Sequence, residues 1–377
     1  MKYLVVGAVT LFGLYLASNL GIQIAALFAF GMVIGAAFFG ATFGFTTGWR
    51  ELLTQGRSQL FTAQILLIAA CTAVLLPIIS ASPDHFGFVR PVGVAFLVGA
   101  FVFGLGAQIA NGCSSGHLFH LAQGRWSTLA TLTAFVFGTM LAVRDFDLWA
   151  ETPVYFVYSL SQDFGPTGST LISLVALAIV LWLLGAHRFN WKTSKGRALV
   201  VAIGLIALAQ IAILLVSSRP WSIAQGFALL GTQLDVALGL GWDLDFSDFW
   251  SSELMSSRLE NPILADTFLI PNIGMIFGAL AVAAWVGGFK LEKFQFKKLL
   301  GMLLGGFMMG YGATIGFGCN VGAFVGGVVS GSAHGWLWIF PALAGSWIGI
   351  QLRPMFGHEE AKVAHQVKPS AIGGTGK

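Results

Sequence analysis

The stretch GLGAQIANGCSSG at residues 104–116 returns as GYGATIGFGCNVG at residues 310–322. Four glycines, one alanine, one isoleucine and one cysteine recur in register, so that Cys113 and Cys319 lie 206 positions apart. Both stretches interrupt a run of apolar residues. Such paired interruptions, at corresponding places in two halves of a chain, are typical of the binding site of membrane proteins built from structural repeats. The pattern therefore predicts two related halves with a functional site at the two cysteines.

The composition of the chain is that of a membrane protein. Of its 377 residues, 56% are hydrophobic and 10% are charged, whereas soluble domains carry about 25% charged residues. A helix needs about 20 apolar residues to cross a bilayer. Such runs lie at residues 22–43, 61–81, 91–109, 127–143, 168–186, 198–216, 268–288, 299–315 and 335–352, with a weaker one at 4–18 and an ambiguous, glycine-rich one at 222–240. The sequence predicts an all-α polytopic membrane protein.

The charged residues lie between these runs and predict the orientation of the chain. Lysine and arginine, which mark cytoplasmic loops, concentrate in residues 48–59, 187–197 and 289–298. Acidic residues concentrate in residues 145–166 and 241–266, which we expect outside. The first residues precede an apolar run without a cleavage site, so we expect a first helix and not a signal peptide. Both termini are then expected on the cytoplasmic side of the membrane.

These boundaries divide the chain into four parts. We expect an N-terminal transmembrane repeat (1–186), a basic cytoplasmic linker (187–197), a C-terminal inverted repeat (198–356) and a disordered cytoplasmic tail (357–377).

The same orientation predicts that the two repeats have inverted topology. The helix before Cys113 is expected to run toward the cytoplasm and the helix before Cys319 away from it. Each cysteine begins a segment too short to cross the bilayer, residues 113–123 and 319–331, and a full span follows each. We therefore expect two re-entrant half-helices, one from each side, that meet near the middle of the bilayer.

The residue types at this meeting point suit a small, soft oxyanion. Glycine lets the chain turn and lets a ligand approach the backbone. The first turn of a helix has unpaired N–H groups and the positive end of the helix dipole, which favour an anion. A thiol adds a weak donor and a polarizable sulfur. The predicted substrate-binding residues are Cys113, Cys319, Gly112, Gly116, Gly318, Gly322, Asn111, Ser114 and Asn320.

Two histidines close to the first cysteine are candidates for gating or proton relay. His117 and His120 lie within an apolar segment, and ionisable groups inside a membrane tend to be functional. Gln108 and Arg125 complete this weaker set. A metal site is not predicted, because Ala323 occupies the place of His117 in the second stretch.

Other features limit the function classes. Cys71 has no counterpart in the repeat, so we interpret it as an apolar filler. The chain contains no Gly-x4-Gly-Lys-[Ser/Thr] nucleotide-binding motif. The spans hold almost no carboxylates, which argues against a chain of buried acids of the kind that proton pumps use. No cofactor and no nucleic-acid partner are predicted.

The two cysteine stretches, together with GFTTGWR at residues 44–50, resemble the YeeE/YedE family of bacterial sulfur-compound transporters. The similarity extends over most of residues 22–353. It implies import of thiosulfate through an hourglass-shaped protein whose central cysteines contact the anion transiently, and a cytoplasmic sulfur carrier of the TusA type as a partner. Thiosulfate-importing members of the family resemble a pattern with a further cysteine at the position of Gly44. With glycine there, this chain is similar to the YedE side of the family.

The sequence therefore favours a non-enzymatic importer of a small sulfur-containing anion, with thiosulfate as the first candidate. A permease for a selenium compound is one alternative. A membrane redox or sulfur-relay protein is another, and it would need the Cα atoms of Cys113 and Cys319 closer than about 7 Å. A metal-ion permease would make His117 and His120 indispensable. In a purely structural membrane subunit, alanine at both cysteines would be harmless.

Overall fold

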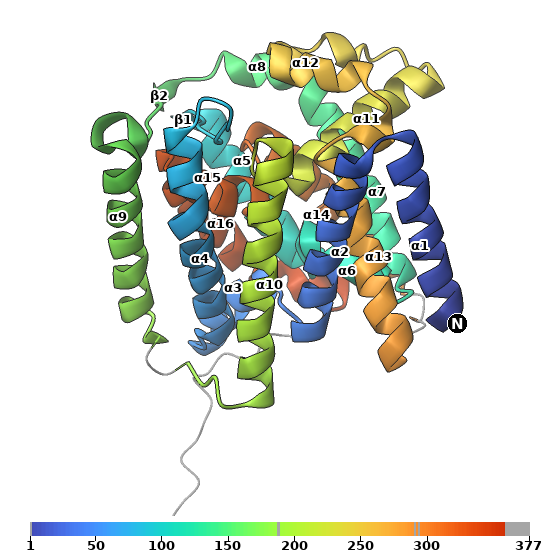
Figure 1. Ribbon diagram of the computed structural model, residues 1–377, viewed down its shortest axis with the longest axis horizontal. Helices are drawn as coiled ribbons and strands as arrows, with labels where there is room; N and C mark the ends of the chain where they lie inside the picture. Colours follow the sequence, from blue (N-terminus) through green and yellow to red (C-terminus); the bar gives the residue numbers. More distant parts are fainter. Residues whose placement is uncertain (1, 187–188, 290–291, 293–294, 359–377) are drawn as a thin grey trace, which may run out of the picture.

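A computed structural model describes residues 2–186, 189–289, 292 and 295–358. The chain forms a helical bundle in which most long helices run roughly parallel to one axis (Figure 1). Within the described residues, nine segments are long and apolar enough to cross a membrane. The prediction of an all-α polytopic membrane protein is confirmed.

The long helices account for most of the chain. They are α1 (Lys2–Asn19), α2 (Ile22–Ala41), α4 (Gln59–Ala81), α5 (Val94–Ile109), α7 (Trp126–Arg144), α9 (Leu160–Leu183), α10 (Ser194–Ser217), α11 (Ile223–Leu238), α13 (Leu269–Val286), α14 (Phe296–Ile315) and α16 (Ala333–Leu352). The shorter elements are α3 (Phe45–Gln55), α6 (Ser114–Leu121), α8 (Phe146–Ala150), α12 (Glu253–Glu260), the π-helix η5 (Asn320–Val325) with α15 (Gly326–Val329), and the 3-10 turns η2 (Leu244–Phe246), η3 (Asp248–Trp250), η4 (Ile263–Ala265) and η6 (Arg353–Phe356).

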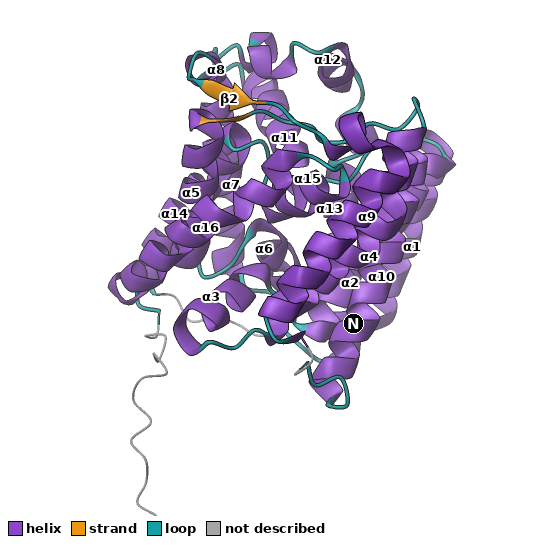
Figure 2. Cartoon of the chain, turned by 90° about the vertical axis from the view of Figure 1, so that its left-hand side faces the viewer, coloured by secondary structure: helices purple, strands orange, loops and turns teal. Residues whose placement is uncertain are grey.

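Two ends of the bundle can be told apart by the elements that cover them. The acidic connections form one end, with α8, α12 and a two-stranded antiparallel sheet of β1 (Val92–Gly93) and β2 (Val154–Phe156) (Figure 1). The start of α1, helix α3 and the connection before α10 lie at the opposite end, where η6 also ends (Figures 1 and 2). The described residues of the basic connections 48–59 and 187–197 thus lie at the end opposite the acidic connections.

Four helices pack closely at the centre of the bundle. Helices α5 and α14 run antiparallel, and glycines bring their backbones together, since a Cβ on Gly312 would lie 2.6 Å from the carbonyl oxygen of Gly99. Helix α16 packs alongside α5, and α7 packs alongside α14. Around them, α2 packs on α13 and α10, and α4 packs on α9 and α10. Small residues are the usual means by which membrane helices approach closely.

The boundaries differ from the sequence prediction in several places. The ambiguous run 222–240 is the helix α11, and the connection 145–166 contains α8 and β2. The short segments after the two cysteines are α6 and the pair η5–α15. In the expected tail, His358 is buried and its Nε2 lies 3.0 Å from the carbonyl oxygen of Ile109. Residues 359–377, and with them the rest of the predicted disordered tail, lie outside the described residues, as do Arg188, Lys290 and Lys293 of the basic connections.

Candidate functional site

The loops that lead into the two cysteines have the same backbone conformation. Asn111 and Phe317, at equivalent positions, both have left-handed φ angles, of 61° and 60°. The residue after each returns a hydrogen bond to the preceding helix, Gly112 to the carbonyl of Ala107 at 2.9 Å and Gly318 to that of Ala313 at 2.7 Å. Each cysteine then occupies the N-cap position of a short helix, with an extended backbone conformation. The sequence repeat is therefore also a repeat of local structure.

The two short helices point in opposite directions away from the cysteines. Helix α6 lies in the half of the molecule that contains α3, whereas α15 lies in the half that contains β1 and β2 (Figures 1 and 2). Ser114, the first residue of α6, lies beside the thiol of Cys319. The N-termini of the two short helices are thus neighbours.

The Cys319 thiol is surrounded by hydrogen-bond donors. It contacts the backbone N–H groups of Val321 and Gly322 in its own short helix and that of Ala224 at the start of α11. Two further side chains of this region, Asn320 and Ser222, are fully buried, and their polar atoms form no hydrogen bond within the described part of the protein. Buried polar groups are nearly always paired in folded proteins, so a cluster without partners suits a bound ligand.

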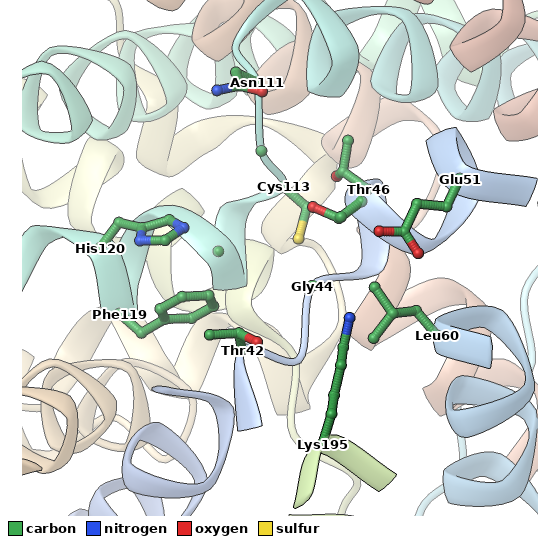
Figure 3. A pocket seen from close by; sticks show the side chains of 13 residues that line it. Thr42, Gly44, Thr46, Glu51, Leu60, Asn111, Cys113, Phe119, His120 and Lys195 are labelled. Carbon is green, nitrogen blue, oxygen red and sulfur yellow. The ribbon is translucent and has the colours of Figure 1, made fainter. Parts of the chain in front are cut away.

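The Cys113 thiol borders a cavity of about 230 Å³. Its Sγ lies 3.1 Å from the hydroxyl of Ser115. The cavity wall combines the first turn of α3, including Gly44 and Thr46, with α6 and with Lys195 at the start of α10. Figure 3 shows the sulfur between Thr46 and His120, and the Lys195 ammonium pointing into the same space.

A second cavity, of about 180 Å³, lies at the acidic end of the bundle. It is lined by Thr314 and Phe317 from the loop before Cys319, by Gln225 of α11 and by Arg90. The Arg90 guanidinium has no ion pair or hydrogen bond to any described residue, and burial lowers its pKa. The two cysteine loops therefore border cavities at opposite ends.

The two histidines near Cys113 occupy different environments. His117 is buried inside the loop, with Nδ1 2.8 Å from the carbonyl oxygen of Cys113 and Nε2 3.2 Å from that of Ala110. His120 lines the cavity and contacts the amide of Gln123 at 3.0 Å. His117 thus braces the cysteine loop, whereas His120 faces the space beside the thiol.

The polar residues at the base of this loop hold it to neighbouring helices. Gln108 donates to the carbonyl of Thr46 at 3.2 Å, which ties α5 to the first turn of α3. The side-chain oxygen of Asn111 accepts from Arg353 at 2.9 Å and from Arg50 at 3.3 Å. Asn111 also lines the 230 Å³ cavity. Burial, and then the charge of Arg353, lowers the pKa of His358 to about 4.

The remaining predicted residues divide into two groups. Gly112, Gly116 and Cys113 line the cavity, whereas Gly318, Gly322 and Asn320 are enclosed around Cys319. Arg125 caps the start of α7, is half-buried and does not line either cavity. No group of three or more metal-ligating side chains occurs among the residues that the structure describes.

The sequence prediction did not identify the contribution of α11. Ser222 and Ala224, near its start, lie against Gly322 and Cys319 as Gly44 and Thr46 of α3 lie near Cys113. One signal was available, because GFTTGW at residues 44–49 corresponds to SIAQGF at 222–227 with a shared glycine and aromatic residue. The match is too weak to stand out without the structure.

Comparison with known proteins identifies the family. The model of the family described as "Sulphur transport" matches residues 40–348. The chain belongs to this family. The match spans both cysteine loops, and it confirms the resemblance to the YeeE/YedE proteins.

Individual relatives agree with the family. The thiosulfate transporter TsuA of Spirochaeta thermophila is 27% identical over 331 residues, which cover 80% of this chain and 91% of the relative. The thiosulfate transporter TsuA of Escherichia coli K12 is 23% identical over 354 residues, 89% of this chain and 98% of the relative. The probable transporter YedE of the same organism is 33% identical over 87 residues, 22% of each chain. The chain is therefore a multi-pass membrane protein of sulfur-compound transport.

Proposed function

We propose that this protein imports thiosulfate across the bacterial cytoplasmic membrane, along a pathway that passes between Cys113 and Cys319. The observation that carries the proposal is the cluster of buried, unpartnered polar atoms of Asn320 and Ser222 near the Cys319 thiol, which Ser114 contacts from the other short helix. The names of the two long relatives support thiosulfate as the substrate. The relatives are named as transporters, which supports a transport role without catalysis.

The binding chemistry follows from the helix starts. The N-termini of α6 and η5–α15 provide backbone N–H groups and two positive dipole ends, which stabilise an anion. The thiols contribute weak donors that face the sulfur of the substrate. Weak contacts let the substrate leave again, as conduction requires. Arg90 would attract the anion to one cavity, and Lys195 would face it in the other.

We further propose that the two halves are inverted repeats, and the packing of the central helices supports this. A Cβ on Gly104 of α5 would lie 2.0 Å from the carbonyl oxygen of Ala342 in α16. A Cβ on the equivalent Gly310 of α14 would lie 2.0 Å from that of Phe135 in α7. Helices α5 and α14 run antiparallel, as inversion of the two halves requires. In this arrangement α6 and η5–α15 are the two re-entrant half-helices.

The basic end of the bundle would face the cytoplasm, with both termini there, because Lys and Arg remain on that side. The boundaries proposed for the repeats are 1–186 and 198–356, joined by the basic linker. Release next to Lys195 would deliver the anion to a sulfur carrier of the TusA type, the partner that the family resemblance implies.

Uptake of radiolabelled thiosulfate tests the proposal. Bacteria that lack their own sulfur importers would express the wild type, Cys113→Ala or Cys319→Ala at matched membrane levels. We expect uptake by the wild type and at least a tenfold loss in both variants, because each removes a donor at the central contact. Cys71→Ala is the matched control, since Cys71 is also a buried free thiol and lies outside both loops.

Each alternative has its own outcome. Uptake that both alanine variants retain would place the pathway elsewhere and refute the central role of the cysteines. No thiosulfate uptake by the wild type, with uptake of a selenium oxyanion instead, would favour the selenium-compound permease. An oxidant-induced crosslink between Cys113 and Cys319 would favour the redox protein.

A further inference from the structure

Two buried amide side chains, one in each half of the protein, make the same set of contacts. Gln64 of α4 donates from Nε2 to the carbonyls of Gly44 and Phe45, at 3.4 and 3.2 Å, and accepts from the indole N–H of Trp49 at 3.0 Å. These carbonyls belong to the first turn of α3, next to Cys113.

Asn272 of α13 repeats this arrangement at the opposite end of the bundle. Its Nδ2 donates to the carbonyl of Ile223 at 3.0 Å, and its Oδ1 accepts from the indole N–H of Trp221 at 3.0 Å. Ile223 is the first residue of α11, whose next residue, Ala224, directs its N–H to the Cys319 thiol. Both amides are fully buried.

A glycine in each first turn makes room for the amide. A Cβ on Gly48 would lie 2.5 Å from Nε2 of Gln64, and a Cβ on Gly226 would lie 2.8 Å from Nδ2 of Asn272. The indole comes from different places, since Trp49 lies within α3 and Trp221 precedes α11. The amide, the carbonyl and the glycine are therefore the repeated elements.

The chemistry of an amide explains why this residue type holds the turn. An indole N–H can only donate, so it fixes the amide oxygen on its side, and the amide nitrogen must then face the backbone carbonyls. A buried polar group without a partner is costly, which keeps the amide from turning over. The amide thus binds backbone carbonyls of each first turn, and the N–H groups of that turn point away from the amide.

The free sides of these two turns face the proposed anion site. Thr46 of α3 lies next to Cys113 (Figure 3), and its buried hydroxyl has no hydrogen bond within the described part of the protein. Ser222, which caps α11, has the same unpartnered hydroxyl, against Gly322. Thr46 and Ser222 are each 1% exposed.

We infer that Gln64 and Asn272 are positioning residues that hold the N-termini of α3 and α11 as two additional donor turns for the transported oxyanion, one at each cysteine. The inference rests on the proposed function and adds to it. The substrate then meets four helix starts, those of α3 and α6 at Cys113 and those of α11 and η5 at Cys319. Neither amide touches the substrate itself.

Transport kinetics test the inference with variants that keep the volume of the side chain. Gln64→Leu loses the three hydrogen bonds of that amide and Asn272→Leu loses two, whereas Gln64→Glu and Asn272→Asp place an oxygen against the backbone carbonyls. We expect each to raise the KM for thiosulfate uptake about tenfold, the effect of weakening one hydrogen bond to an anion. Trp49→Phe, which leaves the amide free to turn, should raise KM less. The control is Gln210→Leu, a buried glutamine of α10 with no hydrogen bond to α3 or α11 among the described residues.

A merely structural role would lower the amount of folded protein and the maximal rate while leaving KM unchanged, and that result would overturn the inference. An equal rise of KM in Gln210→Leu would overturn it as well.

A second readout does not depend on the identity of the substrate. Iodoacetamide alkylation of Cys113 in purified protein, measured by peptide mass spectrometry, reports how the first turn of α3 lies over the cavity that this thiol borders. Gln64→Leu should change this alkylation rate several-fold by displacing the α3 turn, and Gln210→Leu should not. If the wild type fails to transport thiosulfate, the proposed function fails, and this rate still decides the role of Gln64, because an unchanged rate would refute it.

Discussion

At the scale of single residues, the two halves differ where their short helices meet the neighbouring turn. A Cβ on Gly322 would lie 2.2 Å from Oγ and 3.0 Å from Cβ of Ser222, whereas a Cβ on Gly116 would lie 3.7 Å from Sγ of Cys113. Gly44, in the place of Ser222, leaves room for the cavity beside Cys113. The Cys319 half is therefore closed by a side chain that the Cys113 half lacks.

This difference predicts unequal effects of alanine at the two glycines. Gly322→Ala should destabilise the protein by about 1–3 kcal/mol through overpacking, with a lower unfolding temperature in detergent and reduced uptake. Gly116→Ala should retain the unfolding temperature of the wild type. The double variant Gly322→Ala, Ser222→Gly removes the obstructing side chain and should recover most of the loss. Wild-type stability in Gly322→Ala alone would contradict this packing.

At the scale of elements, the antiparallel pair α5–α14 holds the two cysteine loops together. Four glycines line the contact in two equivalent pairs, Gly99 with Gly312 and Gly106 with Gly305. Each pair places a hypothetical Cβ within 2.5–2.7 Å of the opposite carbonyl oxygen. The backbone itself occupies the space, so no side-chain rearrangement can accommodate a methyl group.

Gly312→Ala should therefore force α5 and α14 apart and cost about 3 kcal/mol or more. Gly204→Ala is the control, because Gly204 lies on the exposed side of α10 with nothing within 4 Å of its Cβ position. There the substitution should leave stability unchanged or raise it by up to about 1 kcal/mol. Size-exclusion profiles after heating in detergent measure both, and equal profiles for the two variants would refute the close contact.

The sequence predicted where the helices lie better than it predicted which residues contact each other between them. Apolar runs of about 20 residues determine where helices form, and the repeated cysteine stretch marked both loops. Long-range pairing leaves no local pattern, which is why the contact of Ala224 with Cys319 was not foreseen. Helix α11 has 16 residues, fewer than a full span needs, and this made its run ambiguous. Gln64 and Asn272 are single polar residues within apolar helices, and only their hydrogen bonds reveal their common role.

At the scale of the whole molecule, the two cavities at the cysteine loops differ in the charged residues of the ends at which they lie. The cavity at the acidic end contains Arg90, and the cavity at the basic end contains Lys195. The import that we propose requires the first to face the outside and the second to face the cytoplasm. The proposed direction of transport therefore depends on which end of the bundle faces the cytoplasm.

Labelling of single surface cysteines decides this orientation. Glu260→Cys, at the exposed end of α12, should react with a membrane-impermeant maleimide in intact spheroplasts, whereas Lys192→Cys, exposed before α10, should react only after lysis. The wild type, whose three cysteines are at most 1% exposed, is the matched control that measures any labelling of those cysteines themselves. The opposite labelling pattern would mean that the Lys195 cavity faces the outside. The substrate would then enter the pathway at that cavity. Equal labelling of both sites before lysis would contradict the placement of the two ends on opposite sides of one membrane.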